Sequence, residues 1–145
     1  MADLYIATVK KIEPDLLMAL NNLIPQLTKA PIPTLEEIQN MIDSGSLLFV
    51  VRIGSIVRPI VAMGSLGIFH TPSGVHAHIE DVVVDEKFRG QGIGESLVRT
   101  MLNVASEMNF EGVSLTCNPA RVAANRLYRK MGFTRWDTNV YWYKL

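Results

Sequence analysis

The segment FRGQGIGESLVRTML (residues 88–102) constrains the fold of this chain more than any other stretch. It places three glycines within five positions and continues directly into apolar residues at helical spacing. Strand-like sequence, VHAHIEDVVV (75–84), comes shortly before it. The N-terminus of a helix carries unpaired backbone N–H groups and a partial positive charge, and glycines let that backbone approach an anion closely. We therefore expect a strand–loop–helix unit whose loop is suited to phosphate oxygens.

The glycine loop has competing interpretations on its residues alone. A Walker loop would place Lys and Ser/Thr after its last glycine, but Glu95 and Ser96 follow Gly94. A dinucleotide-binding fold would place the loop after the first strand, with an acidic residue about 20 positions later. Here the loop lies past the midpoint of the chain, and Glu111 is a weak match. A plain strand-to-helix turn with spare glycines stays open on glycine count alone.

The remaining sequence predicts a mixed α/β (α+β) fold. Strands are expected at 4–10, 47–53, 58–69, 75–84, 112–117, 133–138 and 140–145. Helices are expected at 14–27, from a Thr34–Glu37 capping box to Gly45, from the glycine loop to about 109, and at 120–131. The order β-α-α-β-β-β-α-β-α-β-β predicts four helices on a mixed, mostly antiparallel sheet of six to seven strands. No linker, repeat or charge block divides the chain, so we expect one domain over residues 1–145.

Composition argues against several classes of protein. Positive and negative residues balance at 14 each, so no strong field draws the chain to nucleic acid or to an acidic membrane. No apolar run approaches the roughly 18 to 20 residues that span a bilayer, and the first residues lack signal-peptide features. The single Cys117 fits a reducing compartment. We expect a cytoplasmic protein with no membrane or nucleic-acid partner.

Metal-ligand spacing is absent from the sequence. The three histidines and the one cysteine do not form a zinc pattern. His76 and His78 alternate on an expected strand but lack a third ligand. We expect no metal.

The residues around the glycines resemble a family motif. VVVDEKFRGQGIGESL (82–97) is similar, almost position by position, to the acetyl-coenzyme A motif of the GNAT superfamily of N-acetyltransferases. That motif is a strand ending in valine, an aromatic residue, and Arg/Gln-x-x-Gly-x-Gly/Ala opening a helix. Here these are Val84, Phe88 and residues 89–94. A GNAT-like fold is what the resemblance implies.

A second block supports the same resemblance. NPARVAANRLYRKMGF (118–133) looks like the later motif of the family, through Asn125, Tyr128, Gly132 and Phe133. The two blocks cover the C-terminal half of the chain, and the first sixty residues match only in the order of elements.

The resemblance assigns cofactor-binding roles. It implies that the pyrophosphate of acetyl-coenzyme A rests on the backbone of the loop, with the side chain of Arg89 nearby, and that a splayed strand offers backbone groups to the pantetheine amides. The loop residues are Arg89, Gly90, Gln91, Gly92, Ile93 and Gly94, and the strand residues are Val82, Val83 and Val84. It further implies that Asn125 hydrogen-bonds the cofactor and that Tyr128 protonates the departing thiolate. Asn125 and Tyr128 are three residues apart, which places them on one face of a helix.

The general base is expected on the strand HAHIEDVVV (76–84). Family members often carry a glutamate at the position of His78 or of Glu80, so histidine at the first position departs from the commoner pattern. Glu80, acting through a water, is the first candidate, and His78 is the second because imidazole titrates near neutral pH. Simple alternation would place His78, Glu80, Val82 and Val84 on one face of the strand.

These residues predict an acetyl-coenzyme A dependent N-acetyltransferase acting on a primary amine. HIEDV (78–82) also resembles the strand of glucosamine-6-phosphate N-acetyltransferases, which favours a small-molecule acceptor such as an amino sugar. A peptide or protein N-acetyltransferase and a non-catalytic coenzyme A-binding module are the alternatives. The aromatic C-terminal run TNVYWYKL (138–145) has three open roles, as core, acceptor pocket or the edge of a homodimer.

Overall fold

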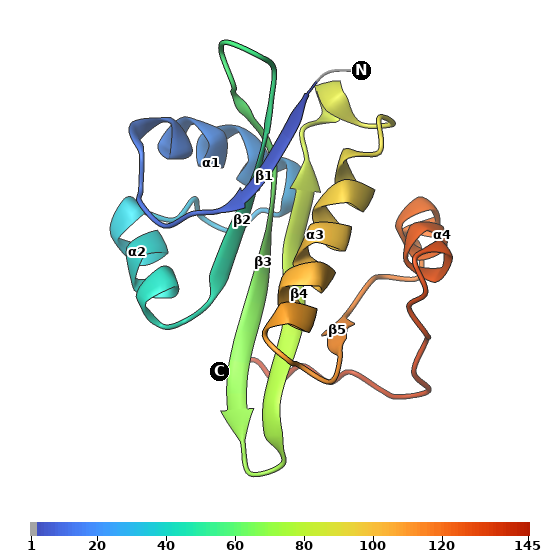
Figure 1. Ribbon diagram of the computed structural model, residues 1–145. Coiled ribbons are helices and arrows are strands. Elements are labelled where there is room, and N and C mark those ends of the chain that lie inside the picture. The colour runs from blue at the N-terminus through green and yellow to red at the C-terminus, as the bar shows by residue number, and fades with distance from the viewer. Residues whose placement is uncertain (1–2) are drawn as a thin grey trace.

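A single open sheet organises the molecule, and helices cover both of its faces (Figure 1). The computed structural model describes residues 3–145. Within that range the strands are β1 (Leu4–Thr8), β2 (Leu47–Ile53), β3 (Ile60–Thr71), β4 (Gly74–Val84) and β5 (Val113–Leu115). The helices are α1 (Pro14–Leu27), α2 (Leu35–Asp43), α3 (Ile93–Glu107) and α4 (Val122–Lys130), with one turn of 3-10 helix, η1 (Glu86–Phe88). The mixed α+β class is confirmed.

The strands lie in sequence order across the sheet, β1-β2-β3-β4-β5. The first three pairings are antiparallel. α1 and α2 lie between β1 and β2, and short connections join β2 to β3 and β3 to β4. β4 and β5 are parallel, because α3 carries the chain back across one face of the sheet before β5 begins. The glycine loop therefore joins a central strand to its crossover helix.

Strand alternation divides the core into two clusters. In β2, Phe49 and Val51 pack with α3, while Leu48 and Val50 pack with α1 and α2. We call these the α3-side cluster and the α1/α2-side cluster. α3 supplies fully buried Leu97 and Met101 to the first, and α1 supplies residues such as Leu20 and Leu23 to the second. The sheet is thus held between two apolar layers, which fixes both ends of the glycine loop.

Local sequence signals place the N-terminal helices as predicted. α1 spans 14–27, with Pro14 in its first turn. The capping box of α2 is present: the backbone N–H of Glu37 donates to Thr34 Oγ1 (3.1 Å), and that of Thr34 donates to Glu37 Oε2 (2.7 Å). Both signals depend only on residues a few positions apart, which explains why they could be read directly.

A bulge in β4 overturns the predicted alternation of its side chains. Glu80 pairs with Ser65 and Val83 pairs with Met63, so residues 81–82 lie opposite Gly64 alone. Asp81 adopts a left-handed backbone conformation, with φ +54°, at the bulge. As a result Ile79 and Val82 both pack in the α3-side cluster, whereas Val83 belongs to the α1/α2-side cluster.

The bulge separates the four side chains that alternation had placed together. His78 and Glu80 flank Ile79 and point to the face opposite α3, while Val82 and Val84 pack on the α3 side. The expectation of one shared face was therefore wrong, because strict alternation holds only while each residue has one partner.

The two closing strands expected at 133–138 and 140–145 are not formed. The sheet has five strands within residues 3–145 rather than six to seven, and residues 133–145 carry no strand or helix. Residues 134–145 are exposed throughout. A strand needs a neighbouring strand to pair its N–H and C=O groups, and strand propensity alone does not supply one. β5 is likewise shorter than expected, at 113–115 instead of 112–117.

Asp85 anchors the end of β4 to α1. It is a buried acidic residue (7% exposed), and its carboxylate accepts hydrogen bonds from Asn22 Nδ2 (2.7 Å) and from the backbone N–H of Lys87 (3.1 Å). Gln26 of α1 accepts the backbone N–H of Glu86 through Oε1 (2.9 Å). These contacts fix the turn η1 directly before the glycine loop. The hydrogen bond from the Lys87 N–H, together with that from Asn22, holds the pKa of Asp85 below its usual value.

Asp85→Asn should lower the free energy of unfolding by about 1–3 kcal/mol, because it places an amide N–H₂ group among buried donors. The pKa of Asp85 is lowered in the folded state, so its contribution is present above the unfolded pKa of about 3.9 and is lost as pH falls through the folded value. Urea unfolding of both proteins at pH 7 and at decreasing pH checks this. The exposed neighbour Glu86→Gln is the control, and equal stabilities of the Asp85 variant and the parent at pH 7 would contradict the assignment.

Candidate active site

The glycine loop turns the chain through two left-handed residues before α3 begins. Gly90 has φ +77° and Gly92, the N-cap of α3, has φ +78°. Residues with a side chain disfavour this left-handed backbone conformation, and glycine adopts it without steric cost. A Cβ at either position would find no heavy atom of the described chain within 4 Å, so the space beside the backbone is open.

The start of α3 has no cap from the part of the chain that the structure describes. No side chain accepts a hydrogen bond at its N-cap, and the backbone N–H groups of 91–95 have no acceptor within residues 3–145. By contrast, α2 is closed by its capping box. Unpaired N–H groups at a helix start, beside open space, form a setting that suits an anion.

A hollow of about 530 Å³ opens beside this loop. It is lined by Asp3, Leu4, Gln91, Gly92, Glu95, Ser96 and Arg99. Glu95 in its wall accepts from Arg99 (2.9 Å) and from Lys130 of α4 (3.2 Å). The hydrogen bond from Arg99 is the main cause of the lowered pKa of Glu95. The negative charge nearest the loop is thus paired with two cations.

The side chain of Arg89 folds back onto the protein. Its Nε donates to the carbonyl of Val84 (2.9 Å), and its Nη2 donates to Gln26 Oε1 (3.4 Å). The guanidinium group therefore braces the loop between β4 and α1. In this arrangement the open donors of the loop are backbone N–H groups.

β4 and β5 pair away from the glycine loop and separate in the part of the sheet that leads towards it. Their pairing covers only Ala77–Ile79 of β4 and Val113–Leu115 of β5. Within the described chain, residues 80–84 of β4 have a strand partner on the β3 side alone. We call the resulting opening the β4–β5 gap. Of the backbone groups of Val82, Val83 and Val84, the Val84 carbonyl is already taken by Arg89.

The two base candidates lie in one hydrogen-bonded line. His78 Nε2 is 3.0 Å from Glu80 Oε1, and His78 Nδ1 is 2.8 Å from Ser114 Oγ. The parallel register that pairs His78 with Ser114 places these side chains together. With neutral His78, Nε2–H donates to the Glu80 carboxylate and Nδ1 accepts from the Ser114 hydroxyl. The His78 side chain is 24% exposed and that of Glu80 is 58% exposed, so the line runs from the sheet towards solvent.

Two residues of this site were missed by the sequence interpretation. Ser114 gave no signal, since its relation to His78 depends on a pairing across 36 positions. Asp81 sits at the bulge, where burial and then the charge of Glu80 raise the pKa of its carboxyl group. Gly64 lies opposite the bulge on β3, and β4 has no glycine at the bulge itself that could have marked it in the sequence.

Tyr128 packs on the α3 side of the sheet. It contacts the α3-side cluster, and its ring meets Phe133 edge-on at 5.5 Å between centroids. Burial is the main cause of the raised pKa of Tyr128, and the nearby Cys117 adds to it. Its hydroxyl group therefore keeps its proton at neutral pH.

Asn125 is engaged within the protein. Its Nδ2 donates to the carbonyls of Arg121 (2.8 Å) and Asn118 (2.9 Å), and lies 3.5 Å from Cys117 Sγ. These contacts hold the loop between β5 and α4, which positions Tyr128 one turn further along the helix. The donor group of Asn125 is occupied, and its Oδ1 remains as the group that could meet a ligand.

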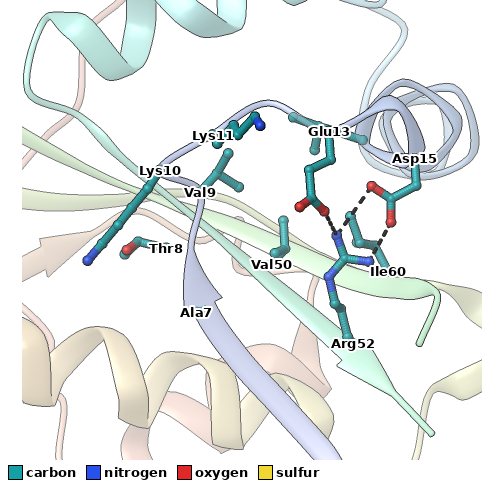
Figure 2. Close-up of a pocket in the computed structure, with 11 residues that line it drawn as sticks. Ala7, Thr8, Val9, Lys10, Lys11, Glu13, Asp15, Val50, Arg52 and Ile60 are labelled. Atoms are coloured by element: carbon teal, nitrogen blue, oxygen red, sulfur yellow. Dashed lines mark hydrogen bonds and ion pairs between the residues drawn. The ribbon is translucent and has the colours of Figure 1, made fainter. Parts of the chain in front are cut away.

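A separate cavity of about 220 Å³ lies between β1, the start of α1 and β2 (Figure 2). None of its lining residues belongs to the glycine loop. Figure 2 shows Arg52 pointing towards Glu13 and Asp15, with which it forms ion pairs. The hydrogen bond from Arg52 lowers the pKa of Asp15. The charges of Arg52, Glu13 and Asp15 thus satisfy one another, and the pair of Arg52 with Asp15 joins β2 to α1.

The family model described as the acetyltransferase (GNAT) family matches residues 17–133. The chain belongs to the GNAT acetyltransferase family. The match includes the glycine loop, the β4–β5 gap and Tyr128, so the features described above lie within the GNAT region. Solved GNAT structures share the fold over nearly all of both chains.

Two solved structures illustrate that likeness. The glucosamine-6-phosphate N-acetyltransferase of Arabidopsis thaliana is 24% identical with a TM-score of 0.79, covering 97% of this chain and 98% of that one. An acetyltransferase of Trypanosoma brucei is 28% identical with a TM-score of 0.77, covering 98% of this chain and 100% of that one.

Curated GNAT relatives match over shorter stretches. A probable glucosamine 6-phosphate N-acetyltransferase 2 of Oryza sativa subsp. japonica is 39% identical over 77 residues, covering 51% of this chain and 45% of the relative. N-acetyltransferase 8B of Rattus norvegicus is 33% identical over 94 residues, covering 64% of this chain and 41% of the relative. The chain spans less than half the length of these two relatives.

Two further observations concern residues 3–145 as a whole. No helix in this range has the length and apolar character to cross a membrane. No group of three or more His, Cys, Asp or Glu side chains in the same range is arranged to hold a metal ion.

Proposed function

We propose that this GNAT protein transfers the acetyl group of acetyl-coenzyme A to the primary amine of a small molecule, such as an amino sugar. One observation carries the proposal: an uncapped helix start with two left-handed glycines stands next to the gap between β4 and β5. The loop offers donors to a pyrophosphate, and the unpaired edge of β4 offers backbone groups to an amide-containing arm.

The donor is held mainly by backbone groups in this proposal. Within residues 3–145 the N–H groups of 91–95 have no acceptor, and the open space beside Gly90 and Gly92 leaves room for phosphate oxygens. The Arg89 side chain hydrogen-bonds Val84 and Gln26 and so holds the loop in place. Its guanidinium group contributes to pyrophosphate binding through its positive charge near the loop. Val82 and Val83 supply the strand backbone, and Asn125 has Oδ1 available.

The acceptor class is supported by sequence similarity. The relative from Oryza sativa, with which this chain shares 39% identity over 77 residues, is named as acting on glucosamine 6-phosphate. The carboxylate of Glu80, beside the gap, suits an ammonium group. An amino sugar is therefore the first acceptor amine that we propose.

The reaction forms one bond and breaks one. The free amine attacks the thioester carbonyl carbon, a C–N bond forms, and the C–S bond breaks as the thiolate leaves. Glu80 takes the amine proton through a water, and the His78 Nε2–H steadies the carboxylate that must be charged to accept it. Tyr128 keeps its proton at neutral pH and donates to the thiolate. Acetyl-coenzyme A supplies an activated acyl group, so no enzyme-bound acyl intermediate is needed.

Acceptor-stimulated release of coenzyme A tests this function directly. The full chain is incubated with acetyl-coenzyme A and a panel of amino sugars, other small amines and peptides, and free thiol is followed. Thiol release with amino sugars supports the proposal. Release only with peptides would replace the acceptor class, and tight binding of acetyl-coenzyme A without release for any amine would point to a binding module.

Gly92→Ala should weaken acetyl-coenzyme A binding by at least about 10-fold, because a Cβ enters the space that the phosphate needs and the left-handed residue is strained by about 1–2 kcal/mol. Gly45→Ala is the matched control. Gly45 also has positive φ (+97°) and open space, but it lies at the end of α2. Calorimetric titration of both variants checks the effect, and an equal loss of affinity in both would show that strain rather than contact is responsible.

Tyr128→Phe should lower kcat by about 10²-fold or more and leave the affinity for acetyl-coenzyme A nearly unchanged, because it removes the proton donor and keeps the ring. The Phe133 contact and the apolar packing survive in the variant. Steady-state kinetics with a binding measurement separates the two effects. An unchanged kcat would remove Tyr128 from the acid role.

Glu80→Gln should depress activity most at low pH, by about 10²-fold or more, because the amine is then protonated and depends on a base. Asp81→Asn is the matched variant on the same bulge, and asparagine tolerates the left-handed backbone that Asp81 adopts. The pH profiles of kcat/KM for both variants check the assignment. A low-pH loss in Asp81→Asn alone would move the base from Glu80 to Asp81.

A further inference from the structure

β3 and β4 extend beyond the rest of the sheet as a two-stranded hairpin. β2 pairs with β3 only as far as Leu66, so residues 67–71 have β4 as their one strand partner within residues 3–145. We call residues 67–78 the hairpin arm. Figure 1 shows the arm running past the other strands to the tight turn at the bottom of the view. The arm thus continues β3 and β4 away from the glycine loop.

One face of the hairpin arm is continuous with the face that carries Glu80. His76, His78 and Glu80 alternate along β4 before the bulge, and Ile79 between them packs in the α3-side cluster, so the three share the face opposite α3. On β3 their partners are Phe69, Gly67 and Ser65. A Cβ on Gly67 would meet only the carbonyl oxygen of His78, at 3.7 Å, among the heavy atoms of the described chain within 4 Å. The middle of this face is therefore open.

A stacked pair of rings stands at the far end of the same face. The centroids of Phe69 and His76 are 5.3 Å apart, their planes differ by 26°, and Phe69 is 50% exposed. His76 Nε2 lies 2.9 Å from Thr71 Oγ1 and 3.1 Å from Ser73 Oγ, and the two hydroxyl oxygens are 2.9 Å apart. These polar contacts fix the ring of His76 beside Phe69. The exposed pair is thus a preorganised surface for binding.

The spacing along β4 sets the size of a ligand that reaches both ends of this face. Glu80 lies four residues from His76, which corresponds to about 13 Å at about 3.3 Å per residue. A pyranose ring, built of bonds of about 1.5 Å, spans only about 5 Å. A single amino-sugar ring with its amine at Glu80 therefore ends over Gly67, whereas two or three linked rings reach Phe69. The face of an aromatic ring carries partial negative charge, which attracts the C–H groups of a sugar and its ammonium groups.

We propose that the hairpin arm is an acceptor subsite, in which Phe69 and His76 bind the far ring of an amino-sugar oligosaccharide whose reacting amine lies at Glu80. The inference rests on the proposed function, because it takes the acceptor amine to lie beside Glu80. A ring bound on the arm is remote from the reacting atoms, so its contacts are the same before and during the reaction. Such contacts lower KM rather than raise kcat. The arm therefore makes the length of the acceptor a basis of selectivity.

Thiol release with glucosamine and with its β-1,4-linked trimer measures this selectivity. The full chain should show a kcat/KM for the trimer at least about 10-fold above that for glucosamine, because the far ring gains an aromatic contact. That exceeds the threefold advantage that three amines give by number alone. Equal kcat/KM per amine for the two acceptors would overturn the proposal.

Paired variants of neighbouring residues test the two faces of the arm. Phe69→Ala should lower the ratio of kcat/KM for the trimer to that for glucosamine by about 5- to 10-fold, mainly through KM. Phe69→Trp keeps an aromatic face and should retain the ratio. His70→Ala is the matched control, since His70 is exposed on the same arm, next in sequence and on the opposite face, and it should leave the ratio unchanged. An equal fall in Phe69→Ala and His70→Ala would contradict the subsite.

Titration of the trimer into the ¹⁵N-labelled chain without acetyl-coenzyme A separates the subsite from the reaction. The amide resonances of 67–71 and 74–78 should shift in the parent and shift less in Phe69→Ala. Arm shifts without thiol release from any amine would refute the proposed function and leave the arm as a saccharide-binding surface. Thiol release from the trimer without arm shifts would refute the subsite and leave the proposed function standing. Absence of both would refute both.

Discussion

The extra residue in β4 is the constraint on which the candidate site depends. Asp81 has a left-handed backbone, and residues 81–82 lie opposite Gly64 alone. As a result, even-numbered side chains lie on one face of the sheet before the bulge and on the other face after it. Before the bulge, His78 meets both Ser114 and Glu80 on one face, and after it Val82 and Val84 support α3 on the other. A regular strand could not place polar chemistry and apolar support in this order.

The glycine loop depends in turn on how β4 is held at its end. Asp85 accepts hydrogen bonds from α1 and from the next turn, and Arg89 returns to the carbonyl of Val84 and to Gln26. The protein therefore uses its side chains to fix the loop and leaves the backbone N–H groups at the start of α3 open. This division explains how a glycine-rich loop is held in place without a cap of its own.

Much of the fold follows from patterns that span only a few residues. The Thr34–Glu37 capping box, the bounds of α1 and the glycines before α3 were all readable because each signal acts within a turn or two of the chain. The prediction of two closing strands was wrong because it depended on contacts between distant residues. Residues 133–145 have strand propensity, but pairing requires a neighbour, and none is aligned with them within the described chain.

The sequence by itself determined the strand–loop–helix unit, its suitability for an anion, and the resemblance to the GNAT family, because these reside in closely spaced residues. Only the tertiary structure decided which face Glu80 occupies, that Ser114 meets His78, and that Asp85 binds Asn22 across 63 positions. Those relations depend on strand register and on a bulge, and a shift of one residue in either moves a side chain to the other face of the sheet. The sequence pattern thus identifies the candidate side chains, and the register of the strands determines which of them lie side by side.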